Sequence, residues 1–235
     1  MDDGLIESFV GQAMLMLERA ADPGRAPEMA AYMKTKMPFW GVQTKERDRI
    51  VRALKRAHPI EDAETYEGVV RALWQGTKRE DKYIAVRVAR AYPRFVSAEM
   101  LKLYEELVRE GAWWDFVDEI AIHLVGGVIE ESPNDTLAMM DQWLHDDDMW
   151  IRRTALLCQL KRKERTDDER LFAYCAARMR EDEFFIRKAI GWALREYSKT
   201  APQSVAAFVN ARRGDLSGLS FREATKVLRK RGWTF

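Results

Sequence analysis

The segments DDDMWIRRTALL (146–157) and EDEFFIRKAIGW (181–192) align at an offset of 35 residues. In both, acidic residues precede an aromatic residue, an isoleucine and two adjacent basic residues. Weaker copies extend this register toward the N-terminus at spacings of 33, 34 and 35, through Tyr83-Ile84, Phe116-Val117, Trp150-Ile151 and Phe185-Ile186. Such a period is typical of helical hairpins that cannot bury their apolar faces alone and stack on their neighbours. The sequence therefore predicts an all-α solenoid of helical repeats.

Helical periodicity runs through almost the whole chain, and strand patterns are nearly absent. Leu5, Phe9 and Leu17 begin an apolar stripe, and residues 98–109 and 182–198 show the same spacing. Prolines that can start or stop a helix fall between such segments, at Pro23, Pro38, Pro59, Pro93, Pro133 and Pro202. We expect about a dozen short helices in a single domain over residues 1–235.

Length and composition exclude several classes of protein. With 235 residues and 47% apolar content, the chain can bury a sizeable core and is not disordered. No run of about 18 apolar residues is available to cross a bilayer. The start, MDDGLIESFV, lacks the basic and apolar regions of a signal peptide. We therefore expect a cytoplasmic protein without membrane attachment.

The cysteines and histidines offer no motif for a metal. Cys158 and Cys175 are the two cysteines, and we interpret them as buried thiols in a reducing compartment. His58, His123 and His145 are scattered without metal-ligand spacing. The sequence therefore predicts no metal site.

The formal net charge of +1 hides an uneven distribution. Residues 151–235 contain 20 basic and 10 acidic residues, a net charge of +10, whereas residues 1–150 contain 19 basic and 28 acidic residues, a net charge of −9. Such a polarised field predicts that a polyanion docks mainly on the C-terminal part. The alternative is an ordinary solvated charged surface.

Two positions that follow the aromatic and aliphatic residues of each repeat change character along the chain. They run from Ala85-Val86 through Asp118-Glu119 and Arg152-Arg153 to Arg187-Lys188. Positions that only support packing keep their type, whereas a groove that contacts different parts of one ligand varies it. We therefore expect these positions to lie on a functional surface.

The motif WWDFVD (113–118) contains a candidate site for a cation. Trp114 and Asp118 are four residues apart, so on a helix they share one face. A cation lies favourably over an indole ring, and a partly dehydrated carboxylate attracts positive charge more strongly than one in bulk water. The alternative is a core tryptophan beside a surface ion pair.

In FFIRKAIGWALREYSK (184–199), an aromatic and basic stripe follows helical spacing. Lys188, Trp192, Arg195 and Lys199 lie on one face, where the cations can bind phosphates and the indole can stack on a sugar or base. The alternative is an amphipathic helix whose long basic side chains reach the solvent. Further basic residues extend the pattern, namely Arg152, Arg153, Lys161, Arg162, Lys163, Arg222, Lys226, Arg229, Lys230 and Arg231.

Four ordered blocks of this sequence resemble the AlkC/AlkD family of DNA glycosylases, in particular the AlkD type. The blocks are YMKTKMPFWGVQTKER (32–47), WWDFVD (113–118), DMWIRR followed by QLK (148–161), and FFIRKAIGWALREYSKT (184–200). The resemblance covers nearly the whole chain. It implies a HEAT-like superhelix that binds alkylated double-stranded DNA and excises cationic N3- and N7-alkylated purines without a metal or organic cofactor. We expect a monomer that associates with the nucleoid when it is bound to DNA.

The resemblance also implies roles for individual residues. Asp118 is the expected catalytic carboxylate, Trp114 and Trp192 are the aromatic walls beside the deoxyribose, and Arg153 is a contact to the phosphate backbone. Further residues are expected to bind DNA or assist there, namely Tyr32, Gln43, Thr44, Arg47, Arg152, Lys188, Arg195 and Lys199. One departure is Asp48, which stands where the family can carry a second basic residue and weakens the expected N-terminal contact.

The expected chemistry suits these residues. Alkylation at N3 or N7 already gives the base a positive charge, so little general acid is needed. As the glycosidic bond breaks, a fixed carboxylate and two π faces stabilise the sugar oxocarbenium ion more than the ground state. Most glycosylases flip the base into a pocket, but the resemblance implies an enzyme that leaves the lesion stacked.

Two other functions stay open from the sequence. One is a HEAT-repeat scaffold without catalytic activity, which would have no need for Asp118 between two tryptophans. The other is a protein that binds damaged DNA without excising the base, which would share the same fold.

Overall fold

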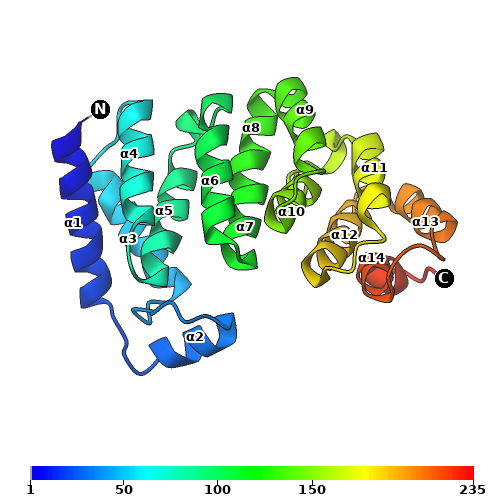
Figure 1. Ribbon diagram of the computed structural model, residues 1–235, viewed down its shortest axis with the longest axis horizontal. Coiled ribbons are helices and arrows are strands. Elements are labelled where there is room, and N and C mark those ends of the chain that lie inside the picture. The colour runs from blue at the N-terminus through cyan, green and yellow to red at the C-terminus, as the bar shows by residue number, and fades with distance from the viewer. Residues whose placement is uncertain (1) are drawn as a thin grey trace. The chain divides into compact units, whose positions relative to one another are not determined.

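The computed structural model describes residues 2–235, and none of them lies in a strand. The described residues form helices joined by short turns and loops, which confirms the predicted all-α class. The chain divides into two compact units, Met1–Val96 and Ser97–Phe235, coloured blue to cyan and green to red in Figure 1. We describe each unit by itself, and the predicted single domain stays a prediction.

The first unit is built around four helices of 12 or more residues, with one shorter helix and a 3-10 turn. Its elements are α1 (Asp3–Arg19), α2 (Ala26–Met33), α3 (Thr44–Ala57), α4 (Ala63–Trp74), α5 (Arg79–Ala91) and the 3-10 turn η1 (Pro93–Phe95). Asp2 and Asp62 start α1 and α4 by accepting hydrogen bonds from backbone N–H groups of the first turn, at 2.9 and 2.8 Å. α1 packs on α3 and α4, and α5 packs on both as well.

The second unit contains the repeats on which the sequence pattern is clearest. Its elements are η2 (Ala98–Met100), α6 (Leu101–Gly111), α7 (Trp114–Glu119), η3 (Ile120–Val125), α8 (Gly126–Glu131), α9 (Pro133–Trp143), α10 (Met149–Leu157), η4 (Lys163–Arg165), α11 (Asp168–Arg178), α12 (Phe184–Tyr197), α13 (Pro202–Ala211) and α14 (Gly218–Lys230). α7 with η3, α10, α12 and α14 pack one on the next and form a row of helices. α9, α11 and α13 pack against this row.

The repeat register is confirmed by burial. Ile84, Val117, Ile151 and Ile186 are the aliphatic residues of the four copies, and each is fully buried near the start of its helix. The prolines also stand where they were expected, because several of them begin helical segments, namely Pro93, Pro133 and Pro202. A side chain of one type at one depth in every repeat is the signature of stacked helix pairs.

Residues 114–131 form one continuous helical stretch that widens to a π-helix at η3. Such widenings are rare and occur frequently at functional sites. Gly126, the first residue of α8, allows close packing on the end of α10, since a Cβ there would lie 2.8 Å from the carbonyl oxygen of Cys158. The segment that carries Trp114 and Asp118 is therefore pressed directly against α10.

Both cysteines are free and buried, as predicted. Burial raises the pKa of the Cys158 thiol to about 12 and also raises that of Cys175, so neither is a thiolate at neutral pH. Over residues 2–235, no helix combines the length and the apolar character needed to cross a membrane.

The loop that precedes α3 is fixed by a buried carboxylate. Glu80 is fully buried and accepts hydrogen bonds from the backbone N–H groups of Trp40, Gly41 and Val42, each at 2.9 Å. Gly41 has a φ of 84°, in the left-handed region, and a Cβ there would lie 2.1 Å from the carbonyl oxygen of Asp22. Only glycine meets both requirements.

Replacing this glycine should destabilise the protein strongly. We expect Gly41→Ala to lower the free energy of unfolding by about 2–4 kcal/mol, because it combines left-handed strain with an overpacked contact. Urea denaturation measures the loss. Gly11→Ala is the matched control: it lies in α1, a Cβ there meets nothing within 4 Å, and we expect a gain of about 0.5–1 kcal/mol from higher helix propensity. Equal midpoints for Gly41→Ala and the wild type would contradict the described loop.

Candidate nucleic-acid repair site

A buried ion pair between α7 and α10 forms the centre of the candidate site. Arg153 Nε donates to Asp118 Oδ1 at 2.7 Å, and Arg153 Nη2 donates to Asp118 Oδ2 at 2.9 Å. Asp118 is 8% exposed and Arg153 is 3% exposed. The third nitrogen, Nη1, donates to the backbone carbonyl of Phe185 at the start of α12. This two-bond geometry fixes the plane and the orientation of the carboxylate.

Two opposing effects act on the charge of Asp118. Removal from water raises the pKa of its carboxyl, and the hydrogen bonds from Arg153 oppose this rise without cancelling it. The neighbouring carboxylates of Asp115 and Glu119 add a smaller upward shift. Arg153 is therefore the group that opposes protonation of this buried carboxylate.

The burial of Arg153 differs from the surface contact expected of it. Its three guanidinium nitrogens are bonded within the protein, so the side chain faces Asp118 and not the solvent. The predicted contact to a DNA phosphate stays a prediction. Its position in this structure supports a different role, which is to orient the Asp118 carboxylate and to favour its ionised form.

An aromatic cluster lies beside this pair. The rings of Trp113, Trp150 and Phe185 are mutually in contact, with centroids 6.0, 5.5 and 4.8 Å apart. The guanidinium carbon of Arg153 lies 5.8 Å from the ring centroid of Phe185. Trp114, half-buried, is one helical turn before Asp118 on the same face of α7, as predicted. The guanidinium group that binds the carboxylate thus lies beside an aromatic cluster.

The stripe predicted on α12 is present up to Arg195. Trp192 is seven residues after Phe185, so it lies on the same face of α12 at about 10 Å along the helix axis. Lys188 Nζ donates to Glu223 Oε1 at 2.7 Å, and Arg195 forms an ion pair with the same carboxylate. The stripe ends there because α12 ends at Tyr197.

Two other expected DNA contacts are also paired with carboxylates. Lys199 lies beyond the end of α12, in a turn, where its amine binds Glu196 at 2.5 Å. Arg152 binds Glu181 with two hydrogen bonds of 3.1 and 2.9 Å, and it also donates to the backbone carbonyls of residues 146 and 147. The Arg152 side chain is 13% exposed. Its hydrogen bonds to Glu181 connect α10 with the loop that precedes α12.

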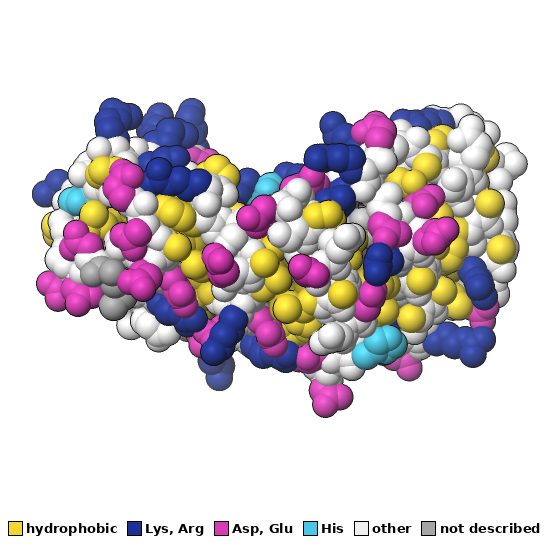
Figure 2. Space-filling view, turned by 90° about the horizontal axis from the view of Figure 1, so that it is seen from above, with side chains coloured by type: hydrophobic (Ala, Val, Ile, Leu, Met, Phe, Trp, Pro, Cys, Tyr) yellow, Lys and Arg dark blue, Asp and Glu magenta, His cyan; other side chains and the backbone are white. Residues whose placement is uncertain are grey.

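Part of the positive charge over residues 151–235 is therefore held in ion pairs within the folded chain. Figure 2 shows Lys and Arg side chains interleaved with Asp and Glu on the face in view. Partners come from the same segment or from the preceding repeat, as in Arg162–Glu130 at 2.9 Å and Arg170–Asp141 at 3.1 Å. Asp118, Glu130 and Asp141 lie outside residues 151–235 and offset part of its net charge of +10, whereas ion pairs within the segment are already counted in that value.

The expected contacts of the first unit surround one pocket of about 690 Å³. Tyr32 is 73% exposed, and Gln43 and Thr44 are exposed at the start of α3. Arg47 is buried: it donates to the carbonyl of residue 42 at 2.7 Å and to Thr44 Oγ1 at 2.9 Å, and it stacks on Tyr83 at 4.4 Å. Burial lowers the pKa of Arg47. The exposed members suit a ligand contact, whereas Arg47 shapes the pocket.

The departure at Asp48 also has a structural account, since its carboxylate forms an ion pair with Arg87 of α5. Within the described part of the chain, no group of three or more His, Cys, Asp or Glu side chains is placed to hold a metal ion.

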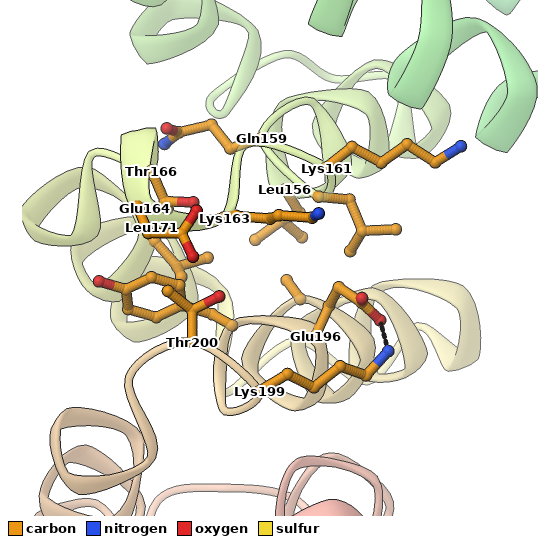
Figure 3. Close-up of a pocket in the computed structure, with 13 residues that line it drawn as sticks. Leu156, Gln159, Lys161, Lys163, Glu164, Thr166, Leu171, Glu196, Lys199 and Thr200 are labelled. Carbon is orange, nitrogen blue, oxygen red and sulfur yellow. Dashed lines mark hydrogen bonds and ion pairs between the residues drawn. The ribbon is translucent and has the colours of Figure 1, made fainter.

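A second pocket, of about 510 Å³, lies between the end of α10, the loop that follows it and the second half of α12. Figure 3 shows Lys163 extending across it and the Glu196–Lys199 ion pair on its α12 side. Neither Asp118 nor Arg153 is among the residues that line it. This cavity is thus distinct from the candidate catalytic carboxylate.

The sequence reading missed the partners that complete the site. Glu223, Glu181 and the cluster tryptophan Trp113 were not singled out. The repeat period could have found Glu223, because it stands 35 residues after Lys188, as Arg153 stands 35 residues after Asp118.

Comparison with known proteins identifies a family whose members resemble this chain. Residues 13–228 match the family model described as DNA alkylation repair enzyme. No curated protein sequence is similar enough to match. A solved structure described as a predicted DNA alkylation repair enzyme from Enterococcus faecalis is 33% identical, with 89% of this chain and 97% of that chain covered and a TM-score of 0.82.

Two more distant structures share the fold. AlkD2 from Streptococcus mutans is 16% identical, with 85% of this chain and 97% of that chain covered and a TM-score of 0.63. The Pseudomonas fluorescens alkylpurine DNA glycosylase AlkC, bound to DNA containing an abasic site analog, is 15% identical, with 97% of this chain and 65% of that chain covered and a TM-score of 0.52. The family match spans both compact units and includes every residue of the candidate site, and on this basis the chain belongs to the DNA alkylation repair enzyme family.

Proposed function

We propose that this protein is a DNA glycosylase that hydrolyses the N-glycosidic bond of cationic N3- and N7-alkylated purines in duplex DNA. The observation that carries the proposal is the buried carboxylate of Asp118, held by two hydrogen bonds from Arg153 one turn away from Trp114. Membership of the DNA alkylation repair family supports it. The similar AlkC is an alkylpurine glycosylase with bound DNA, which supports DNA as the ligand here.

The chemistry follows from a charged leaving group. An alkylated purine departs as a neutral base, and the positive charge passes from the base to the sugar. Asp118 stabilises that charge in a site of low polarity, where electrostatic interactions are stronger than in water. Trp114 and Trp192 are proposed to offer their π faces to the same cation. Asp118 also orients the attacking water and accepts one of its protons.

We further propose that the lesion stays stacked in the duplex. The two pockets described above lie away from Asp118 and Trp114, which is consistent with a lesion that stays outside them. Catalytic groups that approach from the sugar and phosphate side tolerate bulky adducts, because the adduct does not have to enter the protein. The protein is proposed to act as a monomer in the cytoplasm, on nucleoid DNA.

The charge of the lesion should decide whether it is released. We expect release of 7-methylguanine to exceed release of uracil by at least about a thousandfold, since general acid catalysis of this size would be needed for a neutral base and the proposed mechanism contains no general acid. Single-turnover excision from matched duplexes measures both rates. A scaffold or a pure damage binder would release neither base. Efficient removal of uracil would show that a protonating group exists, and the mechanism based on lesion charge would be wrong.

A further inference from the structure

Four charged residues stand at intervals of 35 residues along the row of helices α7, α10, α12 and α14. They are Asp118, Arg153, Lys188 and Glu223. Adjacent members pair, Asp118 with Arg153 and Lys188 with Glu223. The first pair belongs to the proposed catalytic site. The second brings a carboxylate into a stripe that is expected to contact DNA phosphates, and the proposed mechanism gives this carboxylate no task.

The position of this carboxylate is set by close packing of α14 on α12. A Cβ on Gly191 would lie 2.5 Å from Glu223 Cβ and 3.0 Å from the carbonyl oxygen of Ser220, so a larger residue would push α14 away. Ser220 Oγ also donates to the carbonyl of Arg187 at 2.9 Å. These contacts place Glu223 against the turn of α12 that contains Trp192.

Glu223 bridges two cations that lie on either side of Trp192 along the helix. It accepts from Lys188 Nζ at 2.7 Å and forms an ion pair with Arg195. The Glu223 side chain is 15% exposed, whereas those of Lys188 and Arg195 are 40% and 23% exposed. The hydrogen bond from Lys188 lowers the pKa of Glu223 below its usual range, so the carboxylate is ionised at neutral pH.

One anion shared by two cations reduces the positive charge available to DNA. Non-specific affinity depends on how many phosphates are neutralised by Lys and Arg with release of counterions. A phosphate that approaches this stripe must share the two cations with Glu223 or displace its carboxylate. Either event weakens the contact by the same amount on damaged and undamaged duplex, because the phosphate backbone is identical in both.

We propose that Glu223 keeps the non-specific phosphate affinity of this stripe low by partly neutralising Lys188 and Arg195, on damaged and undamaged duplex alike. Contacts made only at a lesion then account for a larger share of the total affinity. The inference rests on the proposed function, because it requires duplex DNA as the ligand of this stripe.

Replacing the carboxylate by an amide of the same shape tests the role of its charge. We expect Glu223→Gln to bind an undamaged duplex several-fold more tightly at low salt, and the slope of log affinity against log salt to steepen by roughly 0.9, the value for one additional phosphate contact. Fluorescence anisotropy between about 50 and 200 mM salt measures both quantities over the range where phosphate contacts respond. Glu223→Ala, which keeps the Cβ that packs on Gly191, is the second variant. Glu169→Gln removes an equal charge from an exposed position of α11 and should leave the slope unchanged.

The outcomes separate this inference from the proposed function. If folded Glu223 variants bind undamaged duplex no better than the wild type, or more weakly, the inference is wrong and Glu223 only orders the stripe. Thermal melting establishes that each variant is folded. Release of 7-methylguanine by the wild type, measured in parallel, tests the proposed function alone. A wild-type protein that binds no duplex at all would overturn both.

Discussion

Asp118→Asn should lower the single-turnover rate of 7-methylguanine release by roughly a thousandfold, since it removes the charge that stabilises the oxocarbenium ion in a water-poor site. This factor corresponds to about 4 kcal/mol of transition-state stabilisation. DNA affinity should stay unchanged or rise slightly, because a negative charge is lost from a site that faces phosphates. The comparison of rate with affinity is made on one methylated duplex, with enzyme in excess.

A neighbouring carboxylate provides the control for this variant. Asp115→Asn removes the same charge from the same helix, three residues before Asp118, and should retain most of the wild-type rate. Asp115 also acts on Asp118 electrostatically, because its charge raises the pKa of Asp118. Rates close to that of the wild type in Asp118→Asn would remove this residue from the mechanism.

Arg153→Met should have the second large effect, because it leaves the Asp118 carboxylate buried without a partner. Breaking a buried ion pair by removal of one member costs about 3–5 kcal/mol of folding free energy. Base release should also fall steeply, since the carboxylate loses its orientation and is more easily protonated. Urea denaturation and single-turnover kinetics measure the two losses. A residue that only contacts phosphate would instead weaken DNA binding and leave stability near the wild-type value.

The activity and the stability of Arg153→Met should depend on pH in a defined direction. Burial already raises the pKa of Asp118, and Arg153 opposes the rise, so the variant should have a still higher pKa. Activity requires the ionised form and should therefore be lost at a higher pH than in the wild type as pH falls. The lost stability should partly return over the same range, because a carboxyl with a raised pKa in the folded state destabilises the fold only when it is ionised.

The double variant Asp118→Leu/Arg153→Met distinguishes the cost of an unpaired carboxylate from a loss of packing around Arg153. Replacing both charges with apolar side chains of similar volume is often neutral or stabilising. We expect the double variant to recover most of the stability that Arg153→Met loses, without any base release. If it is as unstable as the single variant, the loss comes from packing around Arg153 and not from an unpaired carboxylate.

The helices and repeats were predictable because they depend on short spacings. The apolar residues that recur along 98–109 and 182–198 stand a few residues apart and share one face of a helix, and the 35-residue period repeats the same local pattern. Trp114 and Asp118 share a face, as do Lys188, Trp192 and Arg195, because four- and seven-residue spacings decide this without any tertiary contact. One error of this kind was Lys199, since α12 ends at Tyr197.

Whether a charged residue is free or in an ion pair was not predictable from short spacings. From the sequence, Arg152, Arg153, Lys188 and Arg195 form a field of free cations, whereas each is paired in the folded chain. Their partners lie 28–35 residues away along the sequence. Which of these partners comes within hydrogen-bond distance depends on how closely two helices approach, and one missing side chain, that of Gly191, decides this between α12 and α14.

The sequence by itself determined the all-α repeat architecture, the buried face of each helix and the pairing of Trp114 with Asp118 on one face, because these follow from the order of residues within single helices. Only the tertiary structure decided that Arg153 is buried on Asp118 and that Glu223 bridges Lys188 and Arg195. The physical reason is that burial and ion pairing depend on the distance between helices, which the packing of small and large side chains sets and no local pattern encodes.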